Sequence, residues 1–378
     1  MKVEFFRHDL GEAELRAVGQ VLNGPILTTG EAVAQFERRF AAYLGRRCVL
    51  AVTSCTGAMH LSLLALGIGP GDEVITTPMT FIATATAILE AGARPVFVEV
   101  EAETGNLDAS RIEAAITSRT KAILPVHLYG HFCDMRTIRQ IADRHRLFVI
   151  EDSAHCVEGR RDGVGPAGLG HTACFSFYAT KSLTCGEGGA VATDDEGLAE
   201  RLRLLRLHGM TKTAADRHRE GYQHWDMTVL GWKYNMDNLQ AALLLPQLDR
   251  LEENWRRRVA LAERYEARLA GIPGLRWPRT LPTVRHARHL FPVWVPAAAR
   301  DRVVKGLTEA GIQVVVNYRA IHLLSYFRET LGHRPGDFPV AERIGEETIS
   351  LPLYPRMPQE HVDVVCDVLR DLVQDAAG

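Results

Sequence analysis

From residue 49 onward, short and continuous apolar runs alternate with longer helical segments. The runs are rich in β-branched residues, which is typical of strands buried on both faces. Strands of this kind that alternate with helices predict a mostly parallel sheet covered by helices on both sides, and thus an α/β fold. The predicted strands are residues 49–53, 73–77, 95–100, 122–127, 147–152 and 173–178. Because ligands bind at the carboxyl ends of parallel strands, we expect the functional site at that edge.

Helical patterns precede and follow the predicted strands in the sequence. Residues 1–45 are predicted to form two helical pieces around the turn at 23–25, and Gly45 ends the second piece. A long helical pattern covers residues 238–270. Pro246 lies inside it and is expected to kink or restart the helix.

A proline-rich stretch after residue 271 marks the entry to a second, smaller domain. The pattern beyond it predicts strands at 290–295 and 313–316 and helices at 299–310 and 360–373. We therefore divide the chain into a large domain, with the N-terminal helical segment, at residues 1–250 and a small C-terminal domain at residues 251–378.

Charge and cysteine content narrow the possible functions. The 378 residues include 44 basic and 46 acidic side chains, and the formal net charge is −2. This balance lacks the basic surface typical of proteins that bind nucleic acid or anionic membranes, so neither partner is expected. The seven cysteines form no Cys-x-x-Cys pair, and we interpret them as reduced thiols. The absence of a signal-peptide pattern and of any membrane-length apolar run predicts a cytoplasmic protein.

Lys181 follows the predicted strand 173–178 on a short connection that ends in a glycine-rich segment, 186–189. Small neighbours and glycines leave room for a ligand to lie against the backbone. A lone lysine on a loop is more often solvated, so the case for a functional amine depends on its companions.

Asp152 is the first companion, because it ends the apolar strand 147–152. A carboxylate at the end of a buried strand is costly unless it is paired. It could cap the next turn through the backbone of Ala154 or His155. With Lys181 after a later strand, the acid and the amine could also face one crevice.

A second companion is the segment 53–58, Thr-Ser-Cys-Thr-Gly-Ala, between a strand and an apolar helix. Free backbone N–H groups at a helix start, with hydroxyls and a glycine beside them, can bind a phosphate. A simple Ser or Thr N-cap would have the same sequence. Ser176 adds a hydroxyl from the strand before Lys181. His127, His131 and Cys133 lack a convincing carboxylate ligand beside them, so no metal site is expected.

These residues belong to motifs that resemble the sugar aminotransferases of the DegT/DnrJ/EryC1/StrS family, which have the aspartate-aminotransferase fold (fold type I). The resemblance covers nearly the whole chain and implies pyridoxal 5'-phosphate as cofactor. It is carried by Thr53-Ser-Cys-Thr-Gly-Ala, Gly71-Asp-Glu-Val-Ile, Thr80-Phe, Val126-His-Leu-Tyr-Gly, Glu151-Asp-Ser-Ala-His, Ser176-Phe-Tyr-Ala-Thr-Lys, Gly186-Glu-Gly-Gly, Gly231-Trp-Lys-Tyr-Asn-Met and Asn317-Tyr-Arg-Ala-Ile-His.

The resemblance assigns three catalytic residues. Lys181 would form the Schiff base with the cofactor, Asp152 would pair with the pyridine nitrogen, and His155 would lie near the phenolate oxygen. Lysine at position 181 favours amino transfer, because a dehydratase subgroup of the family has histidine there.

Further residues are implied to bind the cofactor or the substrate. The cofactor set adds Phe81, stacked on the ring, and the phosphate-binding residues Thr56, Gly57, Ser176 and Asn235. In the family, the asparagine that Asn235 matches reaches the phosphate from the neighbouring subunit, so a homodimer with shared active sites is expected. Thr29, Tyr318 and His322 match positions near the substrate.

The activity implied is transfer of the amino group of L-glutamate to a keto group of a nucleotide-linked sugar, at the 4-keto position of a 4-keto-6-deoxyhexose or a keto-pentose. One alternative is a 3-keto-sugar or aminocyclitol aminotransferase of the same family. Another is a regulatory protein that binds pyridoxal phosphate without turnover. The regulator would not need Lys181, Asp152 and His155 together, and the sequence has all three.

Overall fold

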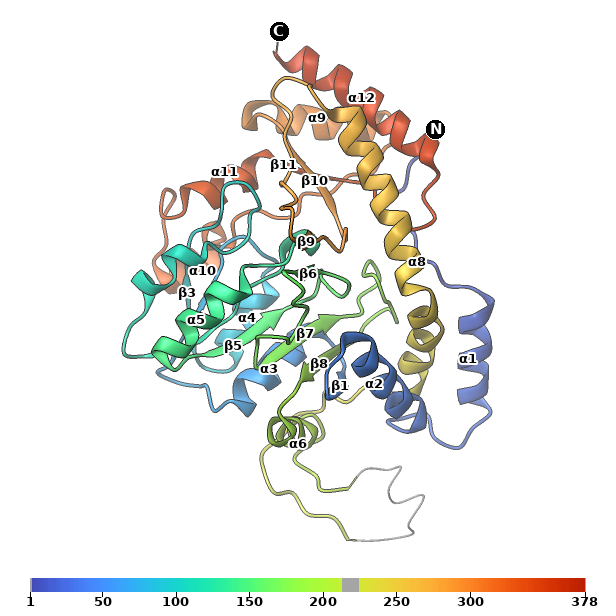
Figure 1. Cartoon of the computed structure of the whole chain (residues 1–378), viewed down its shortest axis with the longest axis vertical. Helices are drawn as coiled ribbons and strands as arrows, with labels where there is room; N and C mark the ends of the chain where they lie inside the picture. Colours follow the sequence, from blue (N-terminus) through green and yellow to red (C-terminus); the bar gives the residue numbers. More distant parts are fainter. Residues whose placement is uncertain (1, 213–223, 378) are drawn as a thin grey trace.

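A seven-stranded sheet forms the centre of the computed structural model, which describes residues 2–212 and 224–377 (Figure 1). In sheet order the strands are β1 (Cys48–Val52), β8 (Gly189–Thr193), β7 (Thr172–Ser176), β5 (Phe148–Asp152), β4 (Thr120–Ile123), β2 (Glu73–Thr76) and β3 (Arg94–Phe97). Neighbours from β7 to β3 pair in parallel, whereas β8 is antiparallel to both β7 and β1. The mostly parallel sheet and the α/β class are confirmed, but β8 was not predicted.

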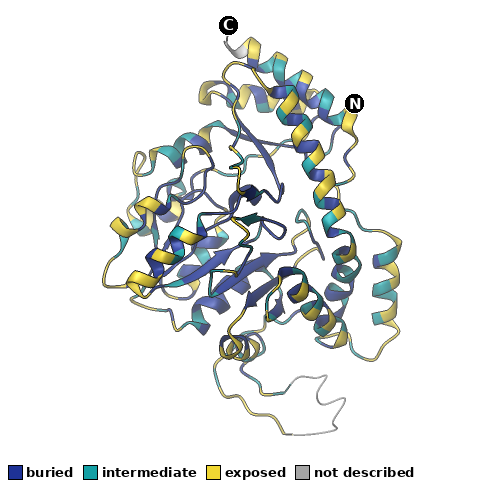
Figure 2. Cartoon of the chain, viewed as in Figure 1, coloured by how far each residue is buried: buried dark blue, intermediate teal, exposed yellow. Residues whose placement is uncertain are grey.

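Helices cover both faces of this sheet, which explains why its strands are apolar without alternation. On one face lie α3 (Cys55–Ala65), α4 (Ala83–Glu90) and α6 (Glu196–Leu205); on the other lie α2 (Glu31–Leu44), α5 (Met135–His145) and part of α8 (Asn238–Leu269). Successive residues of β1 serve the two faces, because Leu50 and Val52 pack on the α3 side while Val49 and Ala51 pack on the α2 side. β7 and β8 are accordingly buried at every residue, and β1 is buried at all but its first (Figure 2).

A second apolar core lies toward the C-terminus. It is built on an antiparallel pair, β10 (Phe291–Trp294) and β11 (Thr348–Leu351), with α9 (Ala297–Glu309), α12 (Gln359–Ala377) and the end of α8. In the chain, α10 (Ser325–Leu331) and α11 (Pro339–Glu347) come between α9 and β11. The strand predicted at 313–316 is absent: this segment makes only one bridge, from Val315 to Ser350. Among the helices that the structure describes, none has the length and apolar character needed to cross a bilayer.

The longest helix, α8, joins the two cores (Figure 1). It does not restart at Pro246, because its 32 residues form one helix across that position. The side of α8 packs against α2 and against α1 (Glu12–Leu22), the two predicted N-terminal helices. The predicted domain boundary at residue 250 falls inside this helix.

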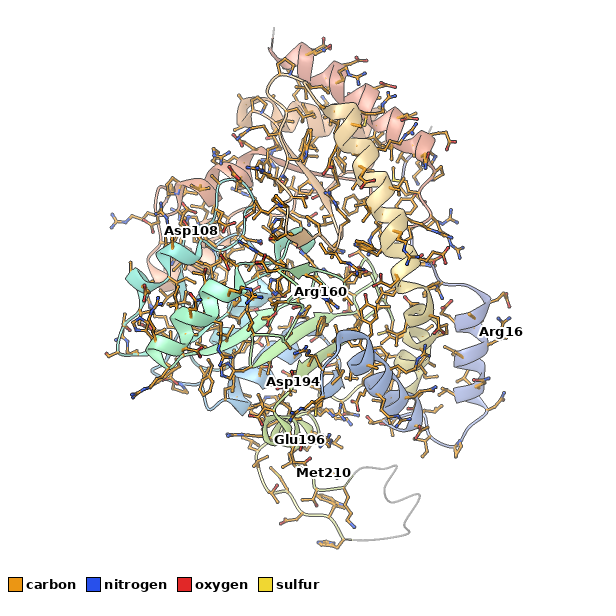
Figure 3. All side chains as sticks on the ribbon, viewed as in Figure 1. Arg16, Asp108, Arg160, Asp194, Glu196 and Met210 are labelled. Atoms are coloured by element: carbon orange, nitrogen blue, oxygen red, sulfur yellow. The ribbon has the colours of Figure 1, made fainter. Side chains whose placement is uncertain are left out.

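Acidic residues fix the connection from β8 to α6 at the edge of the sheet. Asp195 is the N-cap of α6 and accepts the N–H of Leu198, and Asp194 pairs with Arg46 at 2.7 Å. Figure 3 places Asp194 beside the first residue of α6, Glu196. Since Arg46 leads from α2 into β1, this ion pair ties the edge strand β1 to the strand β8 beside it.

Candidate active site

Residues that follow three different strands meet at one edge of the sheet. The adjacent parallel strands β5 and β7 end at Asp152 and Ser176, and β1 leads into the N-terminus of α3. The returning strand β8 connects them, because its first residue, Gly189, is paired with Ser176 on one side and with Val52 on the other. The carboxyl edge that the strand pattern indicated therefore carries the predicted polar residues.

The start of α3 is built to bind an anion. Ser54 is its N-cap and accepts the N–H of Gly57 at 3.0 Å, so the predicted N-cap is present. N–H groups in the first turn of a helix, where Thr56 lies, have no partner within the helix and lie at the positive end of its dipole. A Cβ on Gly189 would lie 2.4 Å from the carbonyl carbon of Ser54, so only glycine allows β8 and the neighbouring Ser176 to approach this closely.

Lys181 lies on a tight turn after β7. Its N–H donates to the carbonyl of Tyr178 at 2.9 Å, which closes the turn. Burial lowers the pKa of Lys181 to about 8, although Asp152 and Cys55 nearby act to raise it. An amine with such a pKa is partly neutral near physiological pH and can take up a proton from a reacting group.

Asp152 is buried and is bound by neutral groups. Its Oδ2 accepts the hydroxyl of Thr84 at 2.8 Å, and Oδ1 accepts the N–H of Ala154 at 3.1 Å, as the predicted turn cap requires. The thiol of Cys55 lies 3.9 Å from Oδ1. Burial raises the pKa of Asp152, while these hydrogen bonds and the charge of Lys181 oppose the rise. A buried carboxylate with neutral partners fits a ligand that brings a positive charge, such as a protonated pyridine nitrogen.

His155 is held in one tautomer. Its Nδ1 accepts the backbone N–H of Tyr129 at 3.3 Å, so the proton lies on Nε2. This Nε2 is 3.1 Å from the hydroxyl of Tyr318, to which it can donate. Burial lowers the pKa of His155, which keeps the ring neutral. Phe81, with 55% of its surface exposed, has its ring 6.0 Å from that of Tyr318.

His289 also belongs to this group and was not predicted. It is buried, its Nε2 lies 3.5 Å from Nζ of Lys181, and its ring centroid is 4.5 Å from that of His155. The residue precedes the predicted strand 290–295, and a histidine next to a strand carries no signal of its own.

The remaining predicted residues fall into two places. Asn235 donates from its side-chain nitrogen to Oγ1 of Thr29 at 2.6 Å, and a bridge to Val52 places Asn235 beside the end of β1. His322 is fully buried, and its Nε2 lies 3.0 Å from the carboxylate of Glu342. Thr29 and Asn235 are thus brought together next to the start of α3, whereas the ring of His322 contacts residues of the C-terminal part.

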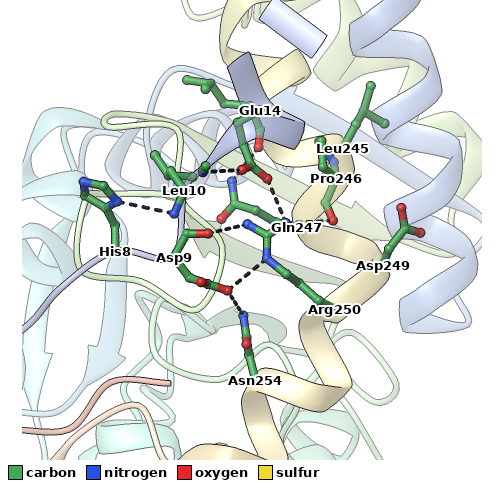
Figure 4. A network of polar contacts seen from close by, with 12 residues as sticks. His8, Asp9, Leu10, Glu14, Leu245, Pro246, Gln247, Asp249, Arg250 and Asn254 are labelled. Atoms are coloured by element: carbon green, nitrogen blue, oxygen red, sulfur yellow. Dashed lines mark hydrogen bonds and ion pairs between the residues drawn. The ribbon is translucent and has the colours of Figure 1, made fainter. Parts of the chain in front are cut away.

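A cavity beside Lys181 opens along the N-terminal segment 6–9, which forms one of its walls. Figure 4 shows how this segment is held on α8: Arg250 donates to Oδ2 and to the backbone carbonyl of Asp9, and it also pairs with Glu14 of α1 at 2.8 Å. Because these contacts are partly buried charge pairs, they fix the wall rather than leave it free to move.

His127, one of the residues considered as a metal ligand, is bound within the protein. Its Nδ1 accepts the N–H of Cys133 at 3.1 Å, which leaves the proton on Nε2 for Glu151 at 2.9 Å. Both side chains are fully buried. Glu151 also accepts the N–H of Gly170, so the pair supports the strand end beside Asp152.

Comparisons with known proteins agree with this geometry. The model of the DegT/DnrJ/EryC1/StrS aminotransferase family matches residues 8–370. The spore coat polysaccharide biosynthesis protein SpsC of Bacillus subtilis is 43% identical over 97% of this chain and 96% of its own. The structure of S. venezuelae DesV superposes with a TM-score of 0.89 at 37% identity, covering 96% of this chain and 94% of DesV. The putative sugar aminotransferase Spr1654 from Streptococcus pneumoniae, in its PMP form, gives a TM-score of 0.94 at 31% identity, over 99% of this chain and 100% of its own.

Proposed function

The chain belongs to the DegT/DnrJ/EryC1/StrS aminotransferase family and is a sugar aminotransferase that depends on pyridoxal phosphate; from this premise we propose its donor and its acceptor. The donor is L-glutamate, and the acceptor is the 4-keto group of a nucleotide-linked 4-keto-6-deoxyhexose or keto-pentose. The observation that carries the chemistry is the buried carboxylate of Asp152 at the end of β5, opposite the amine of Lys181 after β7.

Different residues of the site bind different parts of the cofactor. The N-terminus of α3, with Thr56, Gly57 and Ser176, holds the phosphate by backbone N–H groups and hydroxyls. Phe81 would stack on the ring, and His155 would lie near the phenolate oxygen. Bound in this way, pyridoxal phosphate supplies an electron-poor ring that accepts the electrons left when a proton leaves the donor's α-carbon.

Asp152 and Lys181 then perform the proton chemistry. Asp152 keeps the ring nitrogen protonated, and a hydrogen bond to a charged group of this kind is worth about 1.5 to 3 kcal/mol. Lys181, as a neutral amine, moves a proton between the α-carbon and the adjoining carbon of the cofactor. General acid–base catalysis of this type contributes about 10²- to 10⁴-fold. The pKa of about 8 keeps the amine close to the range in which it both accepts and returns a proton.

The kind of acceptor is supported by the relatives. SpsC is described as a protein of spore coat polysaccharide biosynthesis, and Spr1654 as a putative sugar aminotransferase. These descriptions support a sugar as the acceptor, and a keto-sugar attached to a nucleotide is the acceptor class that we propose.

Absorbance spectroscopy tests this proposal in two steps. With pyridoxal phosphate bound, L-glutamate should replace the visible band of the lysine-linked cofactor by the near-ultraviolet band of its aminated form. Nucleotide-linked 4-keto sugars should then restore the visible band, and 3-keto sugars and inososes should not. A visible band that glutamate leaves unchanged contradicts L-glutamate as the donor and points to another amino donor. Recovery with a 3-keto sugar or an inosose alone contradicts the 4-keto position.

Sharing of the active site between two subunits is part of the proposal. The amide of Asn235 has two N–H groups, of which Thr29 takes one, and its Oδ1 is buried without a partner among the described residues. The second N–H of the amide can donate to an oxygen of a phosphate held by a partner subunit.

Mixed dimers test the sharing directly. We expect dimers of one Asn235→Ala subunit and one Lys181→Ala subunit to contain one intact site, because the working lysine and the working asparagine then meet. Subunits mixed at random should recover about a quarter of wild-type turnover, since half of the dimers are mixed. The control is Asn235→Ala mixed with the double variant, which has no intact site. Confirmed mixed dimers with no more turnover than this control would show that Asn235 serves its own subunit.

A further inference from the structure

His289 lies in direct contact with the amine of Lys181, yet it belongs to a distant part of the chain. The segment 286–289 precedes β10, whereas Lys181 follows β7. Nε2 of His289 is 3.5 Å from Nζ of Lys181, and only 7% of the surface of His289 is exposed. A buried imidazole at this distance from a partly buried amine is a specific polar contact rather than a surface encounter.

A buried ion pair fixes the two segments that make this contact. Arg258 of α8 donates from Nε to the carbonyl of Arg288 at 3.1 Å, and from Nη2 to the carboxylate of Glu158 at 2.5 Å. The other oxygen of Glu158 accepts the hydroxyl of Ser182 at 3.4 Å. Arg288 and Ser182 are the chain neighbours of His289 and Lys181. The guanidinium therefore sets how close the imidazole and the amine can come.

The ring of His289 also packs against a second imidazole. It lies 4.5 Å, centroid to centroid, from the ring of His155, whose tautomer is fixed by Tyr129. With its neighbours bound by Arg258 and its face against His155, the imidazole has little freedom to follow the amine. Lys181, in contrast, has four flexible methylene groups.

We propose that His289 is a positioning residue that holds the amine of Lys181 whenever that amine is not joined to the cofactor. An amino donor or product displaces the lysine in each half of the reaction, and the free amine must stay within reach of the reacting carbon. A misplacement of about 1 Å can cost about 100-fold in rate, so a fixed partner for the free amine is valuable.

The charges around Lys181 determine how this contact is made. The titratable groups facing Nζ are Asp152 from β5, Cys55 from α3, and the histidines His155 and His289. Burial and the charge of Lys181 lower the pKa of His289, so its ring is neutral. Below its pKa the amine is an ammonium group with three donors and no acceptor, so Nε2 of His289 must accept. The contact therefore stabilises the charged form of Lys181 and raises its pKa.

Labelling of the cofactor-free protein tests the inference. The rate at which acetic anhydride modifies Lys181, followed by peptide mass spectrometry across a pH series, reports the fraction of neutral amine. In His289→Phe, which keeps an aromatic ring against His155 but has no acceptor, the midpoint should move about 0.5 to 1 pH unit lower. In His289→Gln, whose amide oxygen reaches the same position, the midpoint should return toward that of the wild type. An unchanged midpoint in His289→Phe overturns the inference.

Turnover provides an independent readout. We expect His289→Phe to lower kcat by about 10-fold or more and to leave KM for the acceptor unchanged, because the free amine is involved only after binding. His289→Gln should recover most of the loss. If His289→Phe does not fold, His289→Leu removes the acceptor with a smaller side chain and is labelled in the same way. Loss of kcat without recovery in His289→Gln would show a packing role and contradict positioning.

The inference rests on Lys181 being the lysine that binds the cofactor, and the labelling experiment separates the two claims. Pyridoxal phosphate added before the reagent should protect Lys181 of the wild type from modification. Absence of protection would refute the assignment of Lys181 in the proposed function. Protection of Lys181 together with an unchanged midpoint in His289→Phe would refute the role of His289 alone.

Discussion

Replacing Lys181 by alanine should lower turnover by at least about 10²- to 10⁴-fold, the contribution of a general acid–base group, because the proton then has no carrier. The variant also loses the only group of this turn that can be joined to the cofactor. We therefore expect two changes in one experiment: amino transfer lowered by at least this factor, and no visible absorption band of a lysine-linked cofactor after addition of pyridoxal phosphate.

Lys305→Ala is the matched control for this variant. Lys305 lies on α9 with 77% of its side chain exposed, and it pairs with Glu309 at 3.8 Å. Its removal should leave the absorption band and the turnover close to those of the wild type. Retention of more than a tenth of wild-type turnover in Lys181→Ala would contradict the assignment of the catalytic amine.

The second large effect is expected on stability, from Arg258→Met. This change removes the positive partner of Glu158, whose side chain is completely buried, and leaves a charge in the interior. Breaking a buried ion pair in this way costs about 3 to 5 kcal/mol of unfolding free energy. Urea unfolding of the wild type and the variant, followed by circular dichroism, should show the loss as a lower midpoint.

The double variant Glu158→Leu with Arg258→Met distinguishes the cost of an unpaired buried charge from the loss of packing. Apolar replacement of both partners of a buried pair is often neutral or stabilising, so the double variant should regain most of the lost stability. It should still transfer amino groups poorly, because the segments of Lys181 and His289 are no longer tied together. A single variant as stable as the wild type would show that Glu158 finds another partner.

The sheet was predictable because strands buried on both faces have a simple composition. Continuous apolar runs such as 147–152 allow few other interpretations, and five of the six predicted strands end within three residues of the observed ends. β8 was missed because its small residues, Gly-Ala-Val-Ala-Thr, resemble the glycine-rich connection before it. The strand predicted at 313–316 has the right composition but forms a single bridge, between Val315 and Ser350.

The candidate site was predictable wherever a residue follows directly from a strand or a helix start. Asp152, Lys181 and Thr56 take their positions from the edge of the sheet, and the order of the elements places them. His289 and Arg258 reach the same place from the C-terminal part of the chain. Nothing in the local sequence shows which of several histidines will be packed against Lys181, because that depends on how α8 and β10 lie in space.

The single helix α8 limits how this chain can be cut into pieces. Its first turns place Ala241 and Leu244 in the core beside the sheet, and its last turns place Tyr265 and Leu269 in the C-terminal core. A fragment that stops at residue 250 would lack Leu251, which packs in the core beside the sheet, and would cut the helix before it reaches the C-terminal core. Truncated or fused versions of this protein should therefore keep the whole helix Asn238–Leu269, with foreign segments inserted elsewhere.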